Sequence, residues 1–104
     1  MGKGKQLNFS KEYKSKILSG VKTSTVRLRT NLKVGEKVQI IAGGEKLGTA
    51  KILKIRRKEI SKLTDEDAEK DGFKSKLELL KALKKHYGKL PKDTSIYIIE
   101  FMME

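Results

Sequence analysis

The chain has 104 residues, no cysteine, one histidine, and 25 lysines and arginines against 13 aspartates and glutamates. This length predicts a single domain over residues 1–104. The composition excludes disulfide bonds and a zinc site built from His and Cys, and it argues against a Ser–His triad. No apolar run reaches the roughly 20 residues that span a bilayer, and no signal peptide is recognisable, so we expect a cytoplasmic protein without a membrane partner.

The positive charge is unevenly distributed along the chain. Residues 1–62 carry 17 basic and 4 acidic side chains, whereas residues 63–104 carry 8 and 9. Such an asymmetry favours a polyanionic partner, of which nucleic acid is the commonest. Dense charge is also a mark of thermophilic proteins, but ion-pair networks need both signs. The imbalance therefore favours nucleic-acid contact over solubility alone.

The first third of the chain predicts a strand, a helix and a second strand. The strand is expected over residues 6–9 and the helix over residues 11–19, with Ser10 as its N-cap and Gly20 as its left-handed end. The apolar side of this helix is expected to consist of Tyr13, Ile17 and Leu18. In the next strand, over residues 23–28, alternation places Val26 and Leu28 on one face and Thr23, Thr25 and Arg27 on the other.

The middle of the chain predicts a β-hairpin. Its strands are expected over residues 37–42 and 49–57, with Gly43-Gly44 in the turn. The apolar pattern changes phase between Ile52 and Leu53, which indicates a bulge or burial on both faces. A basic cluster closes the second strand and consists of Arg56, Arg57 and Lys58.

The last third predicts two helices and a central strand. Thr64 and Asp67 form a capping-box variant before a helix over residues 65–70, and Ser75 with Glu78 precedes a helix over residues 76–87. The inward side chains of this second helix are expected to be Leu77, Leu80, Leu83 and Tyr87, with His86 facing solvent. The final strand, over residues 94–102, is apolar on both faces. Together these elements predict an α+β fold, a small and mostly antiparallel β-barrel flanked by helices.

The segment GVKTSTVRL, residues 20–28, gathers hydroxyl and basic side chains. Its ordinary interpretation is the solvated face of a strand, but it begins in a tight turn, where sites are often built. Lys22 and Thr25 face opposite sides of a straight strand, so they meet only if the chain turns near Thr23. The acidic residues 65–71 are typical of helix N-terminal charges, and Asp71 differs because it precedes Gly72. Among the aromatic residues, one or two could stack on bases, and the others are expected in the core.

The segment GVKTSTVRL resembles the signature of ASCH domains, and the similarity continues through LKVGEKVQI, GTAKILKI, ISKLTDEDAEKDGFKSKLELLKALKKHYG and IYIIEF. It covers nearly the whole chain, from about residue 9 to residue 101. The resemblance implies a PUA-like β-barrel flanked by helices and an RNA partner. Thr25 stands where the broad ASCH pattern has glutamate, and this variant is similar to the small bacterial amidohydrolases that deacetylate N4-acetylcytidine.

Carried over to this chain, that subgroup implies a catalytic set of Lys22, Thr25 and Asp71, with aspartate where the subgroup has glutamate. Thr25 would attack the amide, and Lys22 would take its proton if burial and nearby charges such as Arg27 and Arg29 lower its pKa. Asp71 would orient the amine of the base or handle the proton of the leaving group. No cofactor or metal is expected.

RNA binding without turnover is the interpretation that we rank first, ahead of hydrolysis of a base amide. A cleft of this kind can hold a splayed-out base, while basic side chains bind the phosphates. The expected phosphate contacts are Lys22, Arg27, Arg29, Arg56, Arg57 and Lys58. A basic domain that binds a protein partner is a third option, and the sequence leaves the oligomeric state open, a monomer included.

Overall fold

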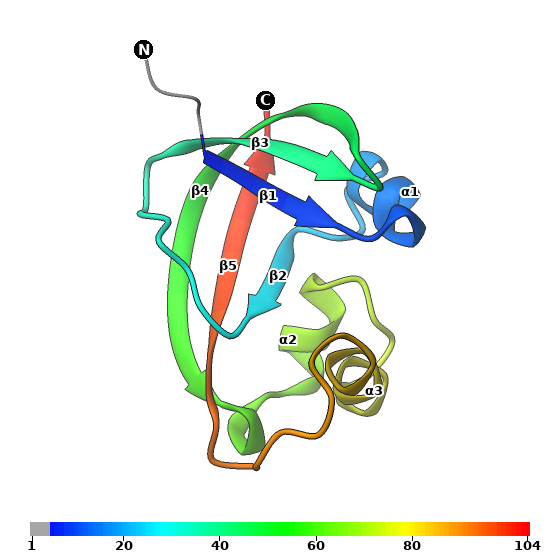
Figure 1. Ribbon diagram of the computed structural model, residues 1–104, viewed down its shortest axis with the longest axis vertical. Coiled ribbons are helices and arrows are strands. Elements are labelled where there is room, and N and C mark those ends of the chain that lie inside the picture. Colours follow the sequence, from blue (N-terminus) through cyan, green and yellow to red (C-terminus); the bar gives the residue numbers. More distant parts are fainter. Residues whose placement is uncertain (1–4) are drawn as a thin grey trace.

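A computed structural model describes residues 5–104 and contains one curled sheet of five strands (Figure 1). The strands are β1 (Lys5–Phe9), β2 (Ser24–Arg27), β3 (Lys37–Ala42), β4 (Glu45–Glu59) and β5 (Ser95–Met103). Their order in the sheet is β1-β3-β4-β5-β2, so that β1 and β2 form its two edges. The β1–β3 pair is parallel and the other three pairs are antiparallel. The predicted α+β class is therefore confirmed, with a mixed half-barrel as the sheet.

Short helices close one side of the half-barrel. They are the 3-10 turns η1 (Lys11–Tyr13) and η2 (Ile60–Lys62) and the α-helices α1 (Lys14–Leu18), α2 (Asp65–Lys70) and α3 (Lys76–Tyr87). The single helix predicted over residues 11–19 is thus divided, because a 3-10 turn forms its first part, as is frequent at helix N-termini. Leu18 is 55% exposed and does not belong to the apolar side predicted for it. Within residues 5–104, no helix is long and apolar enough to cross a membrane.

The two predicted capping boxes differ in the structure. At α2, Thr64 Oγ1 accepts a hydrogen bond from Asp67 N at 3.1 Å, and Asp67 Oδ2 accepts one from Thr64 N at 3.0 Å, which is the reciprocal box. At α3, Ser75 caps Glu78 N at 3.3 Å, but the Glu78 carboxylate accepts from Lys74 N at 3.0 Å. Only half of the second predicted box therefore forms.

The buried face of α3 agrees with the prediction at Leu83 but differs from it at the start of the helix. Leu77 is 62% exposed, whereas Leu79 is 1% exposed and packs under the sheet with Leu83. The prediction for Leu77 was wrong because residues 76–87 offer apolar side chains on more than one face of the helix, and only packing against β5 and α2 selects between them. Tyr87 is on the rim, with 37% exposure.

The hairpin and the bulge form where the sequence predicts them. Gly43 and Gly44 have φ values of 57° and 84°, the left-handed backbone that a two-residue hairpin turn requires. In β4, the pairing with β5 passes from Ile52–Phe101 directly to Lys54–Glu100, so Leu53 is the extra residue of a bulge. The fifteen residues of β4 extend beyond the predicted range at both ends, and the bulge lets this long strand curl.

Two apolar clusters lie on opposite faces of the sheet. One fills the half-barrel and contains Ile99 and Phe101, and the other lies between the sheet and helices α2 and α3 and contains Ile96 and Ile98. β5 contributes to both clusters and lies between β4 and β2, so it is an interior strand, as its two apolar faces predicted. Members of both clusters line one cavity, with Phe9 from the first and Val26 and Leu79 from the second.

Candidate functional site

A cavity of about 160 Å³ lies between the two edge strands of the sheet and α3. Its walls come from β1, η1, β2, the turn after α2, and α3, and comprise Asn8, Phe9, Ser10, Tyr13, Lys22, Thr25, Val26, Arg27, Asp71, Phe73, Leu79, Ala82, Leu83, His86 and Tyr87. An apolar cavity of about 150 Å³ holds one benzene molecule. This cavity therefore has the volume of one six-membered ring.

Lys22 and Asp71 form a buried ion pair in this cavity. They are 3% and 4% exposed, and Lys22 Nζ contacts Asp71 Oδ1 and also donates to the Asp71 backbone carbonyl at 3.0 Å. β2 begins only at Ser24, so the backbone of Lys22 lies outside the strand and is held instead by a hydrogen bond from its N–H to Lys16 O at 2.9 Å. This is the turn near Thr23 that allows Lys22 and Thr25 to face one cavity.

The surroundings of Lys22 change its proton affinity. Burial, and then the charges of Arg27 and Lys16, lower the pKa of Lys22 to about 7. The Asp71 carboxylate acts in the opposite direction, because a nearby negative charge favours the ammonium. Lys22 can therefore exchange its proton near neutral pH, where an ordinary lysine remains charged.

Arg27 joins the other polar groups of the cavity. Its Nε donates to Thr25 Oγ1 at 3.0 Å and its Nη2 donates to the Asn8 carbonyl at 2.7 Å. The guanidinium also lies 4.9 Å from the centre of the Phe9 ring. Burial lowers the pKa of Arg27, but a guanidinium stays protonated at neutral pH. Arg27 thus orients Thr25 and bridges the edge strands β1 and β2 with one side chain.

Three aromatic rings surround Lys22. Its Nζ lies 5.1 Å from the ring centre of Tyr13, 5.5 Å from that of Phe9 and 5.8 Å from that of Phe73. Tyr13 Oη is hydrogen-bonded to His86 Nε2 at 3.0 Å, which ties η1 to α3 across the cavity. Periodicity in the sequence did not distinguish these cavity-lining rings from the aromatic residues of the core. The one available signal was that Phe73 follows the candidate residue Asp71 closely. Within residues 5–104, no group of three His, Asp or Glu side chains could hold a metal ion.

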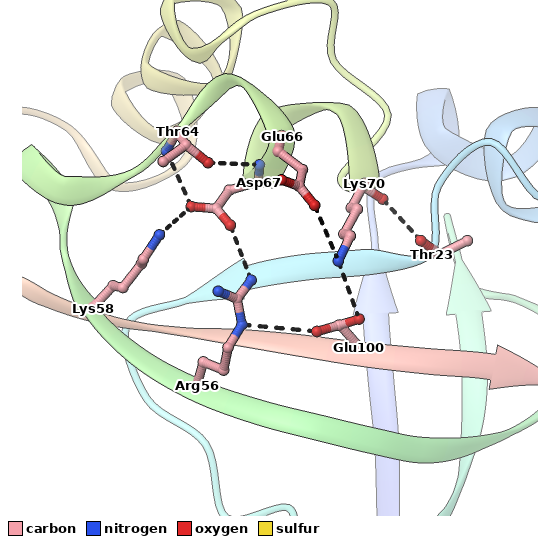
Figure 2. A network of polar contacts seen from close by, with 8 residues as sticks. All are labelled: Thr23, Arg56, Lys58, Thr64, Glu66, Asp67, Lys70 and Glu100. Carbon is pink, nitrogen blue, oxygen red and sulfur yellow. Dashed lines mark hydrogen bonds and ion pairs between the residues drawn. The ribbon is translucent and has the colours of Figure 1, made fainter.

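The predicted basic cluster at the end of β4 is divided between two faces of the sheet. Arg56 Nη2 lies 2.9 Å from Asp67 Oδ1 and Lys58 Nζ lies 2.6 Å from Asp67 Oδ2, as Figure 2 shows. Arg57 points to the other face and is exposed, as is Arg29. None of these four basic side chains is among the described residues that line the cavity. Of the expected phosphate contacts, only Lys22 and Arg27 are in its wall.

Asp67 is a second buried carboxylate on α2, with 4% exposure. Burial alone would raise its pKa, but the hydrogen bonds from Lys58, Arg56 and the backbone of Thr64 hold the pKa well below the usual range of an aspartate. Asp67 therefore stays ionised, with both of its oxygens in contact with donors.

Comparisons with known proteins agree with this architecture. The ASCH domain family model matches residues 3–104. The ASCH domain from Lactobacillus crispatus JV V101 has a similar structure, with a TM-score of 0.78, 16% identity, and coverage of 94% of this chain and 80% of that one. Protein EF3133 from Enterococcus faecalis V583 has a TM-score of 0.71 and 16% identity, with coverage of 99% and 82%.

A third similar structure is hypothetical protein PH0355, with a TM-score of 0.71, 22% identity, and coverage of 94% of this chain and 100% of that one. At these identities the structures share the fold, and none of the curated proteins matches the chain. The family model spans nearly every residue, and the half-barrel with its short helices is the fold that the resemblance implied. The chain belongs to the ASCH domain family, a PUA-like family generally linked to RNA binding.

Proposed function

We propose that this protein binds RNA by taking one single-ring base into the cavity beside Lys22. The observation that carries the proposal is a cavity of about 160 Å³ that combines the buried Lys22–Asp71 pair with the rings of Phe9, Tyr13 and Phe73. Aromatic walls stack on a base. A carboxylate accepts from an exocyclic amine, and cations donate to ring acceptors. These groups suit a base that is unstacked from a single strand.

We expect the phosphates next to the bound base on one face of the sheet. Arg27 is paired in register with Tyr97, and Tyr97 is paired with Arg57. Directly paired residues share a face, so Arg27 and Arg57 are on the same side. Arg29 follows Arg27 closely and is exposed. Contacts of these arginines with phosphates would position an RNA strand without reading its sequence.

Calorimetric titration of the folded protein with cytidine and adenosine tests the cavity. We expect cytidine to bind more tightly, because the two fused rings of adenine exceed the volume of one ring. Asp71→Asn should weaken cytidine binding by about 10- to 100-fold, the value of one hydrogen bond to a charged group. The matched control is Glu69→Gln, which removes an exposed carboxylate of the same helix and should leave binding unchanged.

Titration with a single-stranded oligoribonucleotide at several salt concentrations tests the phosphate contacts. The logarithm of the affinity should fall with the logarithm of the salt concentration, by a slope of about 0.7 for each phosphate that the protein neutralises. A wild-type protein that binds neither cytidine nor the oligoribonucleotide would contradict the proposal. A salt slope near zero would contradict the expected phosphate contacts but not the binding of a base in the cavity.

Hydrolysis of N4-acetylcytidine is a second candidate function, favoured by one observation: Lys22, Thr25 and Asp71 line the same cavity. In this reaction Thr25 Oγ1 bonds to the acetyl carbon while Lys22 takes its proton, and Arg27, at 3.0 Å, stabilises the hydroxyl oxygen. The bond from the acetyl carbon to N4 breaks, and the amine leaves with a proton that Asp71 helps to deliver. Water then releases acetate from Thr25.

Incubation with N4-acetylcytidine, followed by the release of cytidine, tests this candidate. We expect release to increase as the pH rises through about 7, where Lys22 loses its proton. Thr25→Val keeps the shape of the side chain without its hydroxyl and should abolish release, while Thr49→Val, at a position that does not line the cavity, should not. Full activity in Thr25→Val or Lys22→Ala would exclude the assignment.

A further inference from the structure

Helix α2 carries one half of the buried pair at its C-terminal end but has little stability of its own. It spans Asp65–Lys70, and its C-cap residue is Asp71. Isolated helices of this length are not stable in water. The position of the Asp71 carboxylate therefore depends on the contacts that hold α2 at its two ends.

The N-terminal half of α2 is fixed to strand β4. Both oxygens of Asp67 are in use: Oδ1 contacts Arg56 Nη2 at 2.9 Å, and Oδ2 contacts Lys58 Nζ at 2.6 Å and Thr64 N at 3.0 Å. Arg56 and Lys58 alternate with outward residues along β4, so both point to the helix. Charge-assisted hydrogen bonds of this kind are stronger than neutral ones.

The C-terminal end of α2 is fixed to the segment that carries Lys22. Thr23 N donates to Lys70 O at 2.8 Å, which joins the residue after Lys22 to the residue before Asp71. The ammonium of Lys70 lies 3.7 Å from Glu100 Oε1, and Glu100 Oε2 lies 3.8 Å from Arg56 Nε. Arg56 is thus the residue that contacts both the Asp67 end of this network and Glu100 of β5 (Figure 2).

We infer that Arg56, by bridging Asp67 and Glu100, positions helix α2 and thereby sets the contact between Lys22 and Asp71. Arg56 is not among the residues that line the cavity, so it acts through α2 and is a positioning residue. An ordinary surface ion pair contributes little to function or stability. The contact between Arg56 and Asp67 differs because Asp67 is buried. It also differs because the network ends at the two segments that carry Lys22 and Asp71.

Three variants separate positioning from the loss of a charge. Arg56→Met removes the bridge and a positive charge, whereas Arg56→Lys keeps the charge but replaces the two-pronged guanidinium with a single ammonium. Lys51→Met is the matched control, because it removes a positive charge from an exposed position of the same strand that is paired with Met102 and not with Glu100. The two readouts are the affinity for cytidine, which has no phosphate, and the titration of Lys22 Nζ followed by NMR with isotope-labelled lysine.

We expect both Arg56 variants to weaken cytidine binding by about fivefold and to shift the Lys22 titration by about 0.5 pH unit or more, with no comparable change in Lys51→Met. The inference would be overturned if folded Arg56→Lys left both readouts unchanged, or if Lys51→Met reproduced the effects of Arg56→Met. Arg56→Lys decides the question if Arg56→Met does not fold. The ligand readout rests on the proposed function. If wild type does not bind cytidine, that function fails while the Lys22 titration still tests Arg56.

Discussion

Asp67 and Asp71 lie one turn apart at α2 and are equally buried, but their carboxylates differ in what they bind. Each is 4% exposed. Asp67 has both oxygens bound by Arg56, Lys58 and the Thr64 backbone, and it is not among the described residues that line the cavity. Asp71 uses Oδ1 for Lys22, and no hydrogen bond to its Oδ2 comes from the residues that the structure describes. A carboxylate whose two oxygens are both bound within the protein is not available to a ligand. A carboxylate with a free oxygen beside a cavity can still accept a hydrogen bond from one.

Burial and charge therefore do not identify a ligand site by themselves. Both aspartates are buried and both contact cations, so either would be selected by a search for buried ionic groups. The number of partners and the presence of a cavity separate them. Asp67 stabilises the position of a helix, and Asp71 is available to a ligand because its surroundings are incomplete.

The largest expected effect is on stability, and it tests the structural role of Asp67. Asp67→Ala should lower the free energy of unfolding by about 3 kcal/mol, because it leaves Arg56 and Lys58 without their shared carboxylate and removes one of the two hydrogen bonds of the capping box. Asp71→Ala should cost less, because the remaining partner, Lys22, can release its proton. Urea unfolding at pH 7, with Glu69→Ala as the exposed control, measures both. An equal or larger loss of stability in Asp71→Ala would contradict the different roles assigned to the two aspartates.

The two ionic groups should also affect stability at opposite ends of the pH range. The pKa of Lys22 is about 7 in the folded protein, against an ordinary value of 10.5, so the unfolded chain holds one proton more between these values. The free energy of unfolding therefore rises with pH in this interval, by at most about 1.4 kcal/mol per unit. Asp67 has a lowered pKa, so its stabilisation is present above about pH 4 and is lost as the pH falls further.

Urea unfolding over a series of pH values tests these contributions. Lys22→Met should remove the alkaline rise in stability, and Asp67→Asn should reduce the acid loss. A rise of the same size in Lys22→Met would show that other groups cause it and that Lys22 is charged throughout. The two variants serve as controls for each other, since each should leave the other interval unchanged.

The smallest expected effect concerns the neighbours Arg57 and Lys58. Arg57 is exposed, whereas Lys58 is bound to Asp67. Arg57→Met should lower the salt slope of oligoribonucleotide binding by about 0.7, the value for one phosphate contact on a single strand. Lys58→Met should leave the slope unchanged and reduce stability instead. If Lys58→Met lowered the slope as much as Arg57→Met, the distinction between the two faces would fail.

Features set by neighbouring residues were predictable from the sequence. The Thr64–Asp67 capping box, the Gly43-Gly44 turn and the bulge at Leu53 depend on a few adjacent side chains, and all three form. The parallel pairing of β1 with β3 was not predicted, because it joins segments that are separated by a helix and a strand. Leu77 was assigned to the core because periodicity alone does not fix which face of a short helix is covered.

The sequence pointed to three residues that line one cavity, but not to the environment of that cavity. Lys22, Thr25 and Asp71 share a cavity, but the burial of Lys22 depends on a contact with a residue 49 positions away in the chain. The rings of Phe9, Tyr13 and Phe73 become walls only when β1, η1 and the turn after α2 assemble. Arg56 and Lys58 were grouped with Arg57 by proximity in sequence, although strand alternation places Arg57 on the opposite face.

The bridge from Arg27 to Asn8 has a consequence for how the cavity is reached. β1 and β2 are the edges of the sheet, and at this point one guanidinium joins them in place of a backbone ladder. Rotation of a single side chain occurs far faster than the separation of paired strands. A path between β1 and β2 would therefore require a movement of Arg27 and would leave every backbone-paired strand intact. Incomplete closure of the half-barrel thus makes ligand exchange between these edges compatible with an intact sheet.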